Sequence, residues 1–214
     1  MRSLDCPLCG MQAGFFMEAH ARHFYRCDSC DLIFLYPSER LNPQEELERY
    51  QLHQNNDQDS GYRAFLNQLA KPLIERLSAP KEGLDYGCGP GPTLSKMLEK
   101  KGFKMKVYDP YFFNDESVLH QTYDFITCTE TAEHFFSPGK EFKKLDQLLK
   151  PGGWLGLLTQ WVQPDRNFDQ WHYPKDPTHV CFYSRETMRW IAGEYGWNLV
   201  VPAENVTLFY KLNV

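Results

Sequence analysis

The sequence lacks internal repeats, low-complexity segments and long apolar runs. Its 214 residues suffice for one full-sized domain with a small appendage. No window approaches the roughly 18 apolar residues of a membrane-spanning helix. The first residues, MRSLDCPLCG, contain no apolar segment of the kind found in secretion signals. We therefore expect a soluble, cytoplasmic protein that does not contact a membrane.

The sequence also lacks an excess of positive charge. It contains 23 lysines and arginines against 28 aspartates and glutamates, which gives a formal net charge of -5. Proteins that bind duplex nucleic acid neutralise the phosphate backbone with clustered basic residues. Nucleic-acid binding is therefore disfavoured, whereas the sequence leaves the oligomeric state open.

The seven cysteines are an odd number for a disulfide framework, and four of them form two pairs with two residues inside each pair. The four are Cys6, Cys9, Cys27 and Cys30. In a reducing compartment such pairs favour metal over disulfides, and their spacing is that of a zinc ribbon. Four thiolates close a tetrahedron without an open position, so we predict structural zinc. A reduced, metal-free pair of turns is the alternative.

Changes of pattern divide the chain into three predicted segments. Residues 1–40 contain the cysteine pairs and form the zinc ribbon, and residues 41–80 show the apolar period of helices and form a connector. Residues 81–214 form the main domain, in which strand and helix patterns alternate. This alternation predicts an α/β fold with a Rossmann-like, doubly wound and mostly parallel sheet.

The expected strands of the main domain cover 83–87, 104–109, 123–128 and 153–160, and the expected helices cover 92–102, 140–149 and 185–196. Two further strand patterns, WNLVVPA and NVTLFYKLN, stand close enough together for a hairpin. We therefore predict an antiparallel hairpin at the C-terminal edge of the parallel sheet.

A glycine-rich loop follows the first of these strands. The stretch LDYGCGPG places Gly87, Gly89 and Gly91 before a helix, where bare backbone can approach a ligand and the helix N-terminus favours an anion. Asp109 ends the next strand, where a carboxylate can accept both hydroxyls of a ribose. The spacing is not that of a dinucleotide fingerprint, and Asp85 would repel a pyrophosphate but suits a ligand with an ammonium group.

A second polar cluster, TCTETAEHFF, follows the strand YDFITC. Glu130, Glu133 and His134 stand at i, i+3 and i+4, so one helical turn would bring them to the same face. The long loop after the next strand carries His172 and His179, and long loops at this edge of a sheet are often functional. Two carboxylates with imidazoles have the composition of a divalent-metal site. A histidine general base, a hydrogen-bonding role or a helix cap are alternatives.

Four stretches together resemble the class I S-adenosylmethionine-dependent methyltransferases, of methyltransferase type 11, 12 or 23. They are LDYGCGPG, VYDP, YDFITCTETAEH and LLKPGGWLGLLT, and they occur in the order and spacing of that family. The resemblance covers about Gly83 to Thr159 and implies a methyltransferase that takes its methyl group from S-adenosylmethionine. It assigns Asp85, Gly87, Gly89 and Gly91 to the methionine moiety of the donor and Asp109 to its ribose. Further candidates for cofactor binding are Pro110, Tyr111 and Thr129.

One departure from the family pattern concerns the chain between Asp109 and Tyr123. Residues 110–122 are too few for the usual helix and third strand, so we expect this strand to be short or missing. The acid that commonly contacts the adenine amino group in this family would then be missing as well. Pro110, Tyr111 and Phe112 are the nearest candidates to pack on the adenine ring.

The grouping E-x-x-E-H with a distant histidine resembles small-RNA 2′-O-methyltransferases and ubiquinone-pathway O-methyltransferases. This resemblance implies a magnesium or manganese site with Glu130, Glu133, His134 and His179 as ligands. A bound cation lowers the pKa of an alcohol, so that its oxygen attacks the sulfonium methyl in line. Many enzymes of the superfamily keep this grouping without a metal, and the alternative is a general base, namely His134, His172 or His179.

The combination of a zinc ribbon with such a domain resembles bacterial enzymes that modify sugars, polyketide-like compounds or other small metabolites. We therefore expect a small-molecule acceptor that is methylated on oxygen, with nitrogen and carbon as open alternatives. A second hypothesis keeps the donor site but makes the ribbon a docking module for RNA or protein. A third, a dinucleotide-dependent oxidoreductase, predicts nicotinamide binding, which we do not expect.

Overall fold

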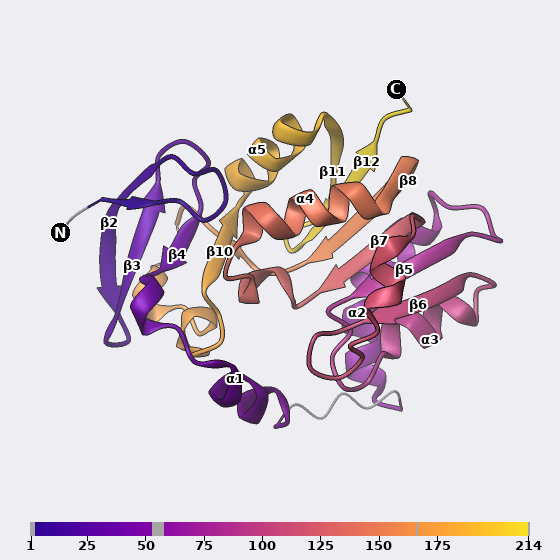
Figure 1. The fold of residues 1–214 in the computed structure, drawn as a ribbon, viewed down its shortest axis with the longest axis horizontal. Helices are drawn as coiled ribbons and strands as arrows, with labels where there is room; N and C mark the ends of the chain where they lie inside the picture. The colour runs from indigo at the N-terminus through magenta and orange to yellow at the C-terminus, as the bar shows by residue number, and fades with distance from the viewer. Residues whose placement is uncertain (1–2, 53–57, 166, 214) are drawn as a thin grey trace.

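Two six-stranded sheets organise the protein (Figure 1). The computed structural model describes residues 3–52, 58–165 and 167–213. The larger sheet has the strand order β11-β12-β8-β7-β5-β6. Its strands are β5 (Glu82–Tyr86), β6 (Lys104–Tyr108), β7 (Tyr123–Thr129), β8 (Leu149–Leu158), β11 (Trp197–Ala203) and β12 (Val206–Lys211). The strands β6, β5, β7 and β8 run parallel, and β12 and β11 add the predicted antiparallel hairpin at one edge.

Helices cover both faces of this sheet. They are α2 (Ser60–Ile74), α3 (Thr93–Glu99), α4 (Pro138–Leu148) and α5 (Arg185–Tyr195). In Figure 1, α4 and α5 lie in front of the sheet, and α2 and α3 lie behind it. Leu66, Leu69 and Leu73 of α2 are buried, and Leu69 packs so closely on Gly156 of β8 that a larger residue there would displace it. The predicted doubly wound, Rossmann-like architecture is thereby confirmed.

The chain between β6 and β7 forms no strand. It contains only the short helix η2 (Glu116–His120), and every residue of this stretch is described. The sheet therefore ends at β6, as the short spacing of the sequence predicts. Among the described residues, no helix has the length and apolar character needed to span a membrane.

The second sheet begins in the ribbon and ends in the main domain. Its ribbon strands are β1 (Leu4–Asp5), β2 (Gln12–Ala19), β3 (Arg22–Cys27) and β4 (Ile33–Leu35). The strand β10 (Cys181–Ser184) pairs antiparallel with β4, and β9 (Trp161–Val162) pairs with β10. The segment expected to be one long loop thus contains β9, η4 (Phe168–Gln170), η5 (Tyr173–Lys175) and β10. The division at residues 40 and 80 stays a prediction, but the first and third segments share this sheet.

The connector contains η1 (Pro37–Glu39) and the short helix α1 (Pro43–Tyr50) before α2. The side chain of Asn42 accepts hydrogen bonds from the backbone nitrogens of Gln44 and Glu45, and the Glu45 side chain accepts one from the nitrogen of Asn42. This capping box determines where α1 begins. In Figure 1, α1 lies near the lower edge of the view, apart from the other labelled helices.

Candidate active site

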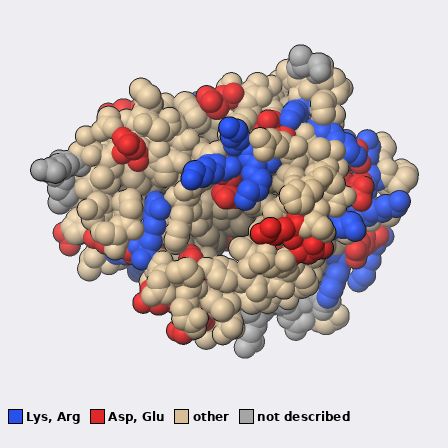
Figure 2. Space-filling model, viewed as in Figure 1, with Lys and Arg blue, Asp and Glu red and all other residues tan. Residues whose placement is uncertain are grey.

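A cavity of about 660 Å³ lies at the carboxyl ends of β5, β6 and β7. Ligands of parallel sheets bind at this edge, and the volume is typical of a small-molecule site. The predicted residues on its wall are Gly87, Gly89, Asp109, Pro110, Thr129, Glu130, His134 and His179. Figure 2 shows a hollow on this side of the molecule, with basic and acidic side chains interspersed around it.

The glycine loop forms the cavity floor under tight geometric constraints. Gly87 and Gly89 have φ values of 76° and 63°, in the left-handed region that favours glycine. A Cβ atom on Gly87 would overlap the side chain of Thr131, whose hydroxyl donates to the Gly87 carbonyl at 3.0 Å. The loop therefore needs glycine at 87 both for its backbone angle and for its contact with the residues that follow β7. Gly91 does not line the cavity.

Asp109 joins the glycine loop to the loop after β6. Its Oδ2 accepts a hydrogen bond from the Gly89 nitrogen at 2.9 Å, and its Oδ1 accepts from the nitrogens of Tyr111 and Phe112 at 2.9 and 3.1 Å. The side chain is on the cavity wall although the residue is buried. Each carboxylate oxygen can accept more than one hydrogen bond, so ligand hydroxyls can still bind here.

Asp85 lies behind the glycine loop and not on the cavity wall. Its two oxygens accept hydrogen bonds from the hydroxyls of Thr127 and Ser95 at 2.8 and 2.9 Å. Burial raises the pKa of Asp85 to about 6, although the two hydroxyls act in the opposite direction. In this position the carboxylate links β5 to β7 and α3, and its predicted contact with an ammonium group stays a prediction.

Tyr111 also lies off the cavity wall. Its hydroxyl donates to Glu46 of α1 at 2.9 Å, and its ring lies 5.5 Å from that of Tyr50. Phe112 and Pro110 line the cavity instead. They are the aromatic and apolar surfaces that the loop after β6 offers to a planar ligand.

Glu130 follows β7 directly and adopts a left-handed backbone, with a φ of 47°. Such a conformation costs a non-glycine residue about 1–3 kcal/mol and is often found at functional sites. The side chain lines the cavity, and its Oε1 is buried without a hydrogen-bond partner in the structure. Burial raises the pKa of Glu130 to about 9, with a further contribution from the charge of Glu133.

Glu133, His134 and His179 form a compact group. One potential ligand atom from each of the three lies within 4.8 Å of the others. The hydroxyl of Tyr173 donates to Oε1 of Glu133 at 2.5 Å, while Oε2 of Glu133 is buried without a partner. The Nδ1 atom of His134 contacts the carbonyl of Thr178 at 3.0 Å, and that of His179 contacts the carbonyl of Tyr173 at 2.9 Å.

These contacts place a proton on Nδ1 of both imidazoles. A carbonyl oxygen only accepts, so the Nδ1 atoms of His134 and His179 are the donors, and the lone pair of a neutral ring would be on Nε2. Burial lowers the pKa of His179 to about 4, which keeps this ring neutral near pH 7. Neutral imidazoles with a free Nε2 can bind a metal or accept a proton.

The structure separates two predicted residues from this group. Glu130 contributes no atom to it, so three of the four predicted divalent-metal ligands come together. His172 is exposed, does not line the cavity, and contacts Gln160 with its Nε2 atom at 3.4 Å.

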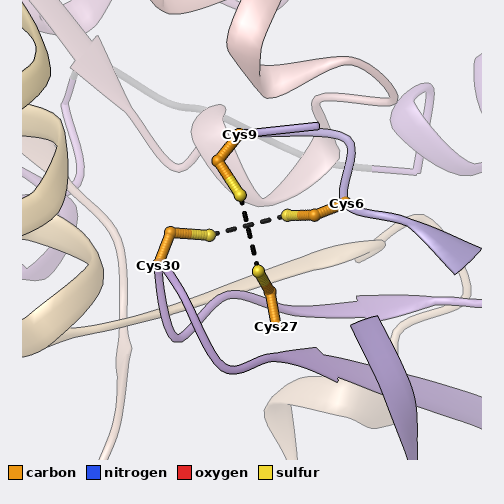
Figure 3. A group of neighbouring side chains, drawn as sticks. All are labelled: Cys6, Cys9, Cys27 and Cys30. Atoms are coloured by element: carbon orange, nitrogen blue, oxygen red, sulfur yellow. Dashed lines mark hydrogen bonds between the residues drawn. The ribbon is translucent and has the colours of Figure 1, made fainter. Parts of the chain in front are cut away.

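The predicted zinc cysteines do converge. In Figure 3 their Sγ atoms point toward one centre, with 3.5 Å between Cys6 and Cys30 and 3.4 Å between Cys9 and Cys27. A tetrahedron with Zn–S bonds of about 2.3 Å has sulfur–sulfur edges of about 3.8 Å, so the four thiols fit zinc. The distances exclude disulfides, whose sulfurs are bonded at about 2.05 Å. The hydrogen bond between Cys6 and Cys30 lowers the pKa of Cys6 to about 5 and raises that of Cys30, so Cys6 is the thiol of this pair that loses its proton first.

No sequence motif indicates Glu46, and Tyr50 of the same helix was not among the predicted site residues. Glu46 lines the cavity and is buried, with its oxygens 2.9 Å from the hydroxyl of Tyr111 and 3.3 Å from that of Tyr50. The Tyr50 ring stands edge to face against His134, with centroids 5.3 Å apart. Only the i, i+4 spacing of Glu46 and Tyr50 hints at a shared face, and a glutamate on a short polar helix is usually solvated.

Sequence comparisons identify relatives of this chain. The family model described as a methyltransferase domain matches residues 58–201. Ubiquinone biosynthesis O-methyltransferase of Burkholderia cenocepacia is 32% identical over 108 residues, which cover 38% of this chain and 45% of the relative. The match therefore spans less than half the length of that curated protein.

Two solved structures share the fold. The first is 1,6-didemethyltoxoflavin-N1-methyltransferase of Burkholderia thailandensis, with 1,6-didemethyltoxoflavin and S-adenosylhomocysteine bound; it is 12% identical, with a TM-score of 0.54 over 93% of this chain and 99% of that one. A protein of Pyrococcus horikoshii is 16% identical, with a TM-score of 0.53 over 78% of this chain and 99% of that one. At such identities the likeness concerns the fold alone.

Proposed function

The chain belongs to the family of methyltransferase domains, and we propose on this premise that it transfers the methyl group of S-adenosylmethionine to a small molecule. The observation that carries the proposal is the hydrogen bond between Gly89 and Asp109, which joins two predicted donor-binding elements on one cavity wall. The glycine loop would take the methionine moiety, and Asp109 would accept the ribose hydroxyls. Pro110 and Phe112 would pack on the adenine.

The acceptor atom that we propose is an oxygen. The partial match to ubiquinone biosynthesis O-methyltransferases supports it, as does the group of Glu133, His134 and His179 beside the donor elements. A lone pair of the acceptor oxygen would attack the methyl carbon in line, and the carbon–sulfur bond would break with its electrons remaining on sulfur. The hydroxyl proton would pass to a free imidazole Nε2 atom, and S-adenosylhomocysteine would leave.

As an alternative to the imidazole base, the same three side chains would fit a divalent cation, which would then occupy the free histidine nitrogens. Both histidines donate Nδ1 to backbone carbonyls, which is the usual support of metal-binding imidazoles, and Glu133 has one oxygen without a partner. Two imidazoles and one carboxylate suit manganese better than magnesium, which prefers all-oxygen ligands. When bound, such an ion would supply acidity to the acceptor hydroxyl.

The cysteine tetrahedron would hold structural zinc. Its four sulfurs leave no open position, so we assign this metal no part in methyl transfer. The cytoplasmic location and the disfavoured nucleic-acid binding remain predictions from composition.

The proposal is tested in two steps. Calorimetric titration of S-adenosylhomocysteine into the purified protein should show binding at one site, and NADH should show none. Methyl-labelled S-adenosylmethionine is then incubated with phenols, catechols, sugars and amines, with and without manganese. Label transfer to a hydroxyl compound is the expected result. Absence of S-adenosylhomocysteine binding would disprove the donor assignment, and transfer to amines alone would disprove the oxygen assignment.

A further inference from the structure

We propose that Arg22 of the ribbon is a positioning residue for the methyl transfer proposed above, because it holds the segment on which Glu133, His134 and His179 are hydrogen-bonded. This segment comprises residues 173–179. The inference rests on the proposed function of that site and adds a role for the ribbon within it.

The 173–179 segment supports every member of the Glu/His group. Tyr173 contributes its hydroxyl to Glu133 and its carbonyl to His179, while the carbonyl of Thr178 accepts from His134. A shift of this segment would therefore move all three side chains at once. The geometry of the site therefore depends on the position of this segment.

Arg22 binds this segment through its backbone. Nη2 donates to the carbonyls of Pro174 and Asp176, the latter at 3.1 Å, and Nη1 donates to the carbonyl of Pro177 at 3.3 Å. The planar guanidinium has five donors in a fixed fork, so one side chain can satisfy several carbonyls that face the same point. Prolines at 174 and 177 lack an N–H donor, and the nitrogens of Asp176 and His179 donate within the segment, to the carbonyls of Tyr173 and Asp176, so Arg22 adds hydrogen bonds that come from the ribbon.

The ribbon presents Arg22 at the first position of β3. The preceding turn has His20 and Ala21 in the left-handed region, with φ values of 52° and 57°. This turn reverses the chain between β2 and β3 and places the ribbon hairpin beside the segment before β10 (Figure 1). Burial lowers the pKa of Arg22, while the charges of Asp176 and Glu39 oppose that effect and favour the cation.

A second arginine from the N-terminal part holds the same segment. Arg49 of α1 donates to Oδ2 of Asp176 at 3.0 Å, and Oδ1 of Asp176 accepts from the nitrogen and hydroxyl of Thr178. The ribbon and the connector thus both contact the 173–179 segment. A ribbon that is built into the site in this way acts as a support, which distinguishes it from a separate docking module.

The test uses the full-length, zinc-loaded protein without added divalent metal. Arg22→Ala is compared with Arg26→Ala, a matched control on the same strand whose side chain pairs with Asp31 near the surface. Amide hydrogen exchange of residues 173–180 and the nitrogen-15 spectra of the imidazole rings are recorded for each. We expect exchange to become at least about tenfold faster in Arg22→Ala only, with altered ring signals of His134 and His179.

Rescue separates positioning from general destabilisation. Guanidinium ion at millimolar concentration should restore the ring signals of Arg22→Ala, and Arg22→Lys should restore them only in part because an ammonium lacks the planar fork. If Arg22→Ala does not fold, the same exchange rates and ring signals are compared between Arg22→Lys and Arg26→Lys, and a change in Arg22→Lys alone would support the proposal. Unchanged exchange and ring signals, or equal changes in the Arg26 control, would overturn the proposal.

Binding of S-adenosylhomocysteine distinguishes a failure of the proposed methyl transfer from a failure of the proposed role of Arg22. It should stay within about twofold of the wild type in Arg22→Ala, because Asp109 and the glycine loop lie on other elements. Failure of the wild type to bind would count against the proposed function. Normal binding together with an unperturbed 173–179 segment would count against the role of Arg22 alone.

Discussion

His134 and His179 stand edge to face with ring centroids 4.8 Å apart, and each donates its Nδ1 proton to a backbone carbonyl. One ring comes from the turn after β7 and the other from the segment before β10, which are far apart in the sequence. Glu133 lies beside both rings, with one potential ligand atom of each residue within 4.8 Å of the others. This relationship underlies the predictions on metal binding and pH dependence.

Asp109→Ala should weaken binding of S-adenosylhomocysteine by about 100-fold. The substitution removes the acceptor for the ribose hydroxyls and also releases the Gly89 nitrogen, which together correspond to roughly 3 kcal/mol. Isothermal titration calorimetry measures the change. Asp115→Ala is the control, because this exposed aspartate caps η2 and does not line the cavity. Equal affinities of wild type and Asp109→Ala would refute the donor assignment.

Glu133→Gln should weaken manganese binding, whereas Glu130→Gln should leave it within about threefold of the wild type. The reason is that Glu133 groups with both histidines and Glu130 does not. Removing one charged ligand of three typically costs at least about tenfold in affinity. Electron paramagnetic resonance of free manganese during titration gives the dissociation constant of each variant. A larger loss in Glu130→Gln would favour the four-ligand arrangement that the sequence suggests.

The contribution of His179 to the free energy of unfolding should fall as the pH drops from about 6.5 toward about 4. Burial lowers the pKa of His179 to about 4, so at this position the unfolded chain binds more protons in this window. The contribution lost would approach about 1.4 kcal/mol per pH unit and about 3 kcal/mol in total. Glu130 and Asp85, whose pKa values are raised by burial, act in the opposite direction, so the His179 contribution is measured by urea unfolding as the difference between the wild type and His179→Gln.

His179→Gln should show a smaller loss over the same pH range, because the group that takes up the proton on unfolding is gone. His120→Gln, at an exposed position, should keep the slope of the wild type. An identical slope in all three proteins would show that His179 is not the residue responsible.

Gly139→Ala should destabilise the protein although alanine favours helices. A Cβ atom there would overlap the backbone carbonyl of Leu8, and the Gly139 nitrogen donates to the carbonyl of Pro7 at 3.1 Å. The first cysteine turn of the ribbon thus packs against the start of α4, and overpacking costs about 1–3 kcal/mol. Gly193→Ala in α5 meets nothing within 4 Å and should stabilise by about 0.5–1 kcal/mol. Chemical denaturation gives the free energy of unfolding of each variant. Stabilisation by both substitutions would contradict the close packing of Gly139 against Leu8.

Cys27→Ser should remove the zinc from the ribbon and increase hydrogen exchange in β2 and β3. Cys27 is fully buried between the two cysteine turns, and loss of one of four ligands would release the zinc that is expected to hold these turns together. Elemental analysis after chelator washing measures the metal. Cys88→Ser, outside the cysteine tetrahedron, should retain the zinc content of the wild type. A metal-free wild type with an intact ribbon would refute the zinc assignment.

Local patterns were sufficient to predict the parallel strands, the terminal hairpin and the missing third strand. Each depends on the apolar period of a short stretch or on the number of residues between two strands. The glycine loop and Asp109 were also predictable, because the carboxyl ends of neighbouring parallel strands meet at one edge. The convergence of the four cysteines follows from two pairs of ligands at fixed spacing.

Other relationships had no local signal. The pairing of β4 with β10, the approach of Glu46 to the cavity and the contacts of Arg22 join residues separated by tens to more than a hundred positions. Which loops meet at the cavity depends on the packing of the whole chain. Short strands such as β10 also have no sequence pattern of their own. Glu130 contributes no atom to the Glu/His group although it stands close to Glu133 and His134 in the sequence, and its left-handed backbone had no local signal either.

The amino-acid order alone therefore determined the fold class, the family resemblance and the place of the glycine loop and Asp109 at one edge of the sheet, since these follow from periodicity and spacing along the chain. The folded structure decided which side chains meet. It placed Asp85 behind the glycine loop, left His172 at the surface and brought His134 and His179 together. Such encounters follow from long-range packing, in which each side chain takes the position that its neighbours' hydrogen bonds and volumes allow.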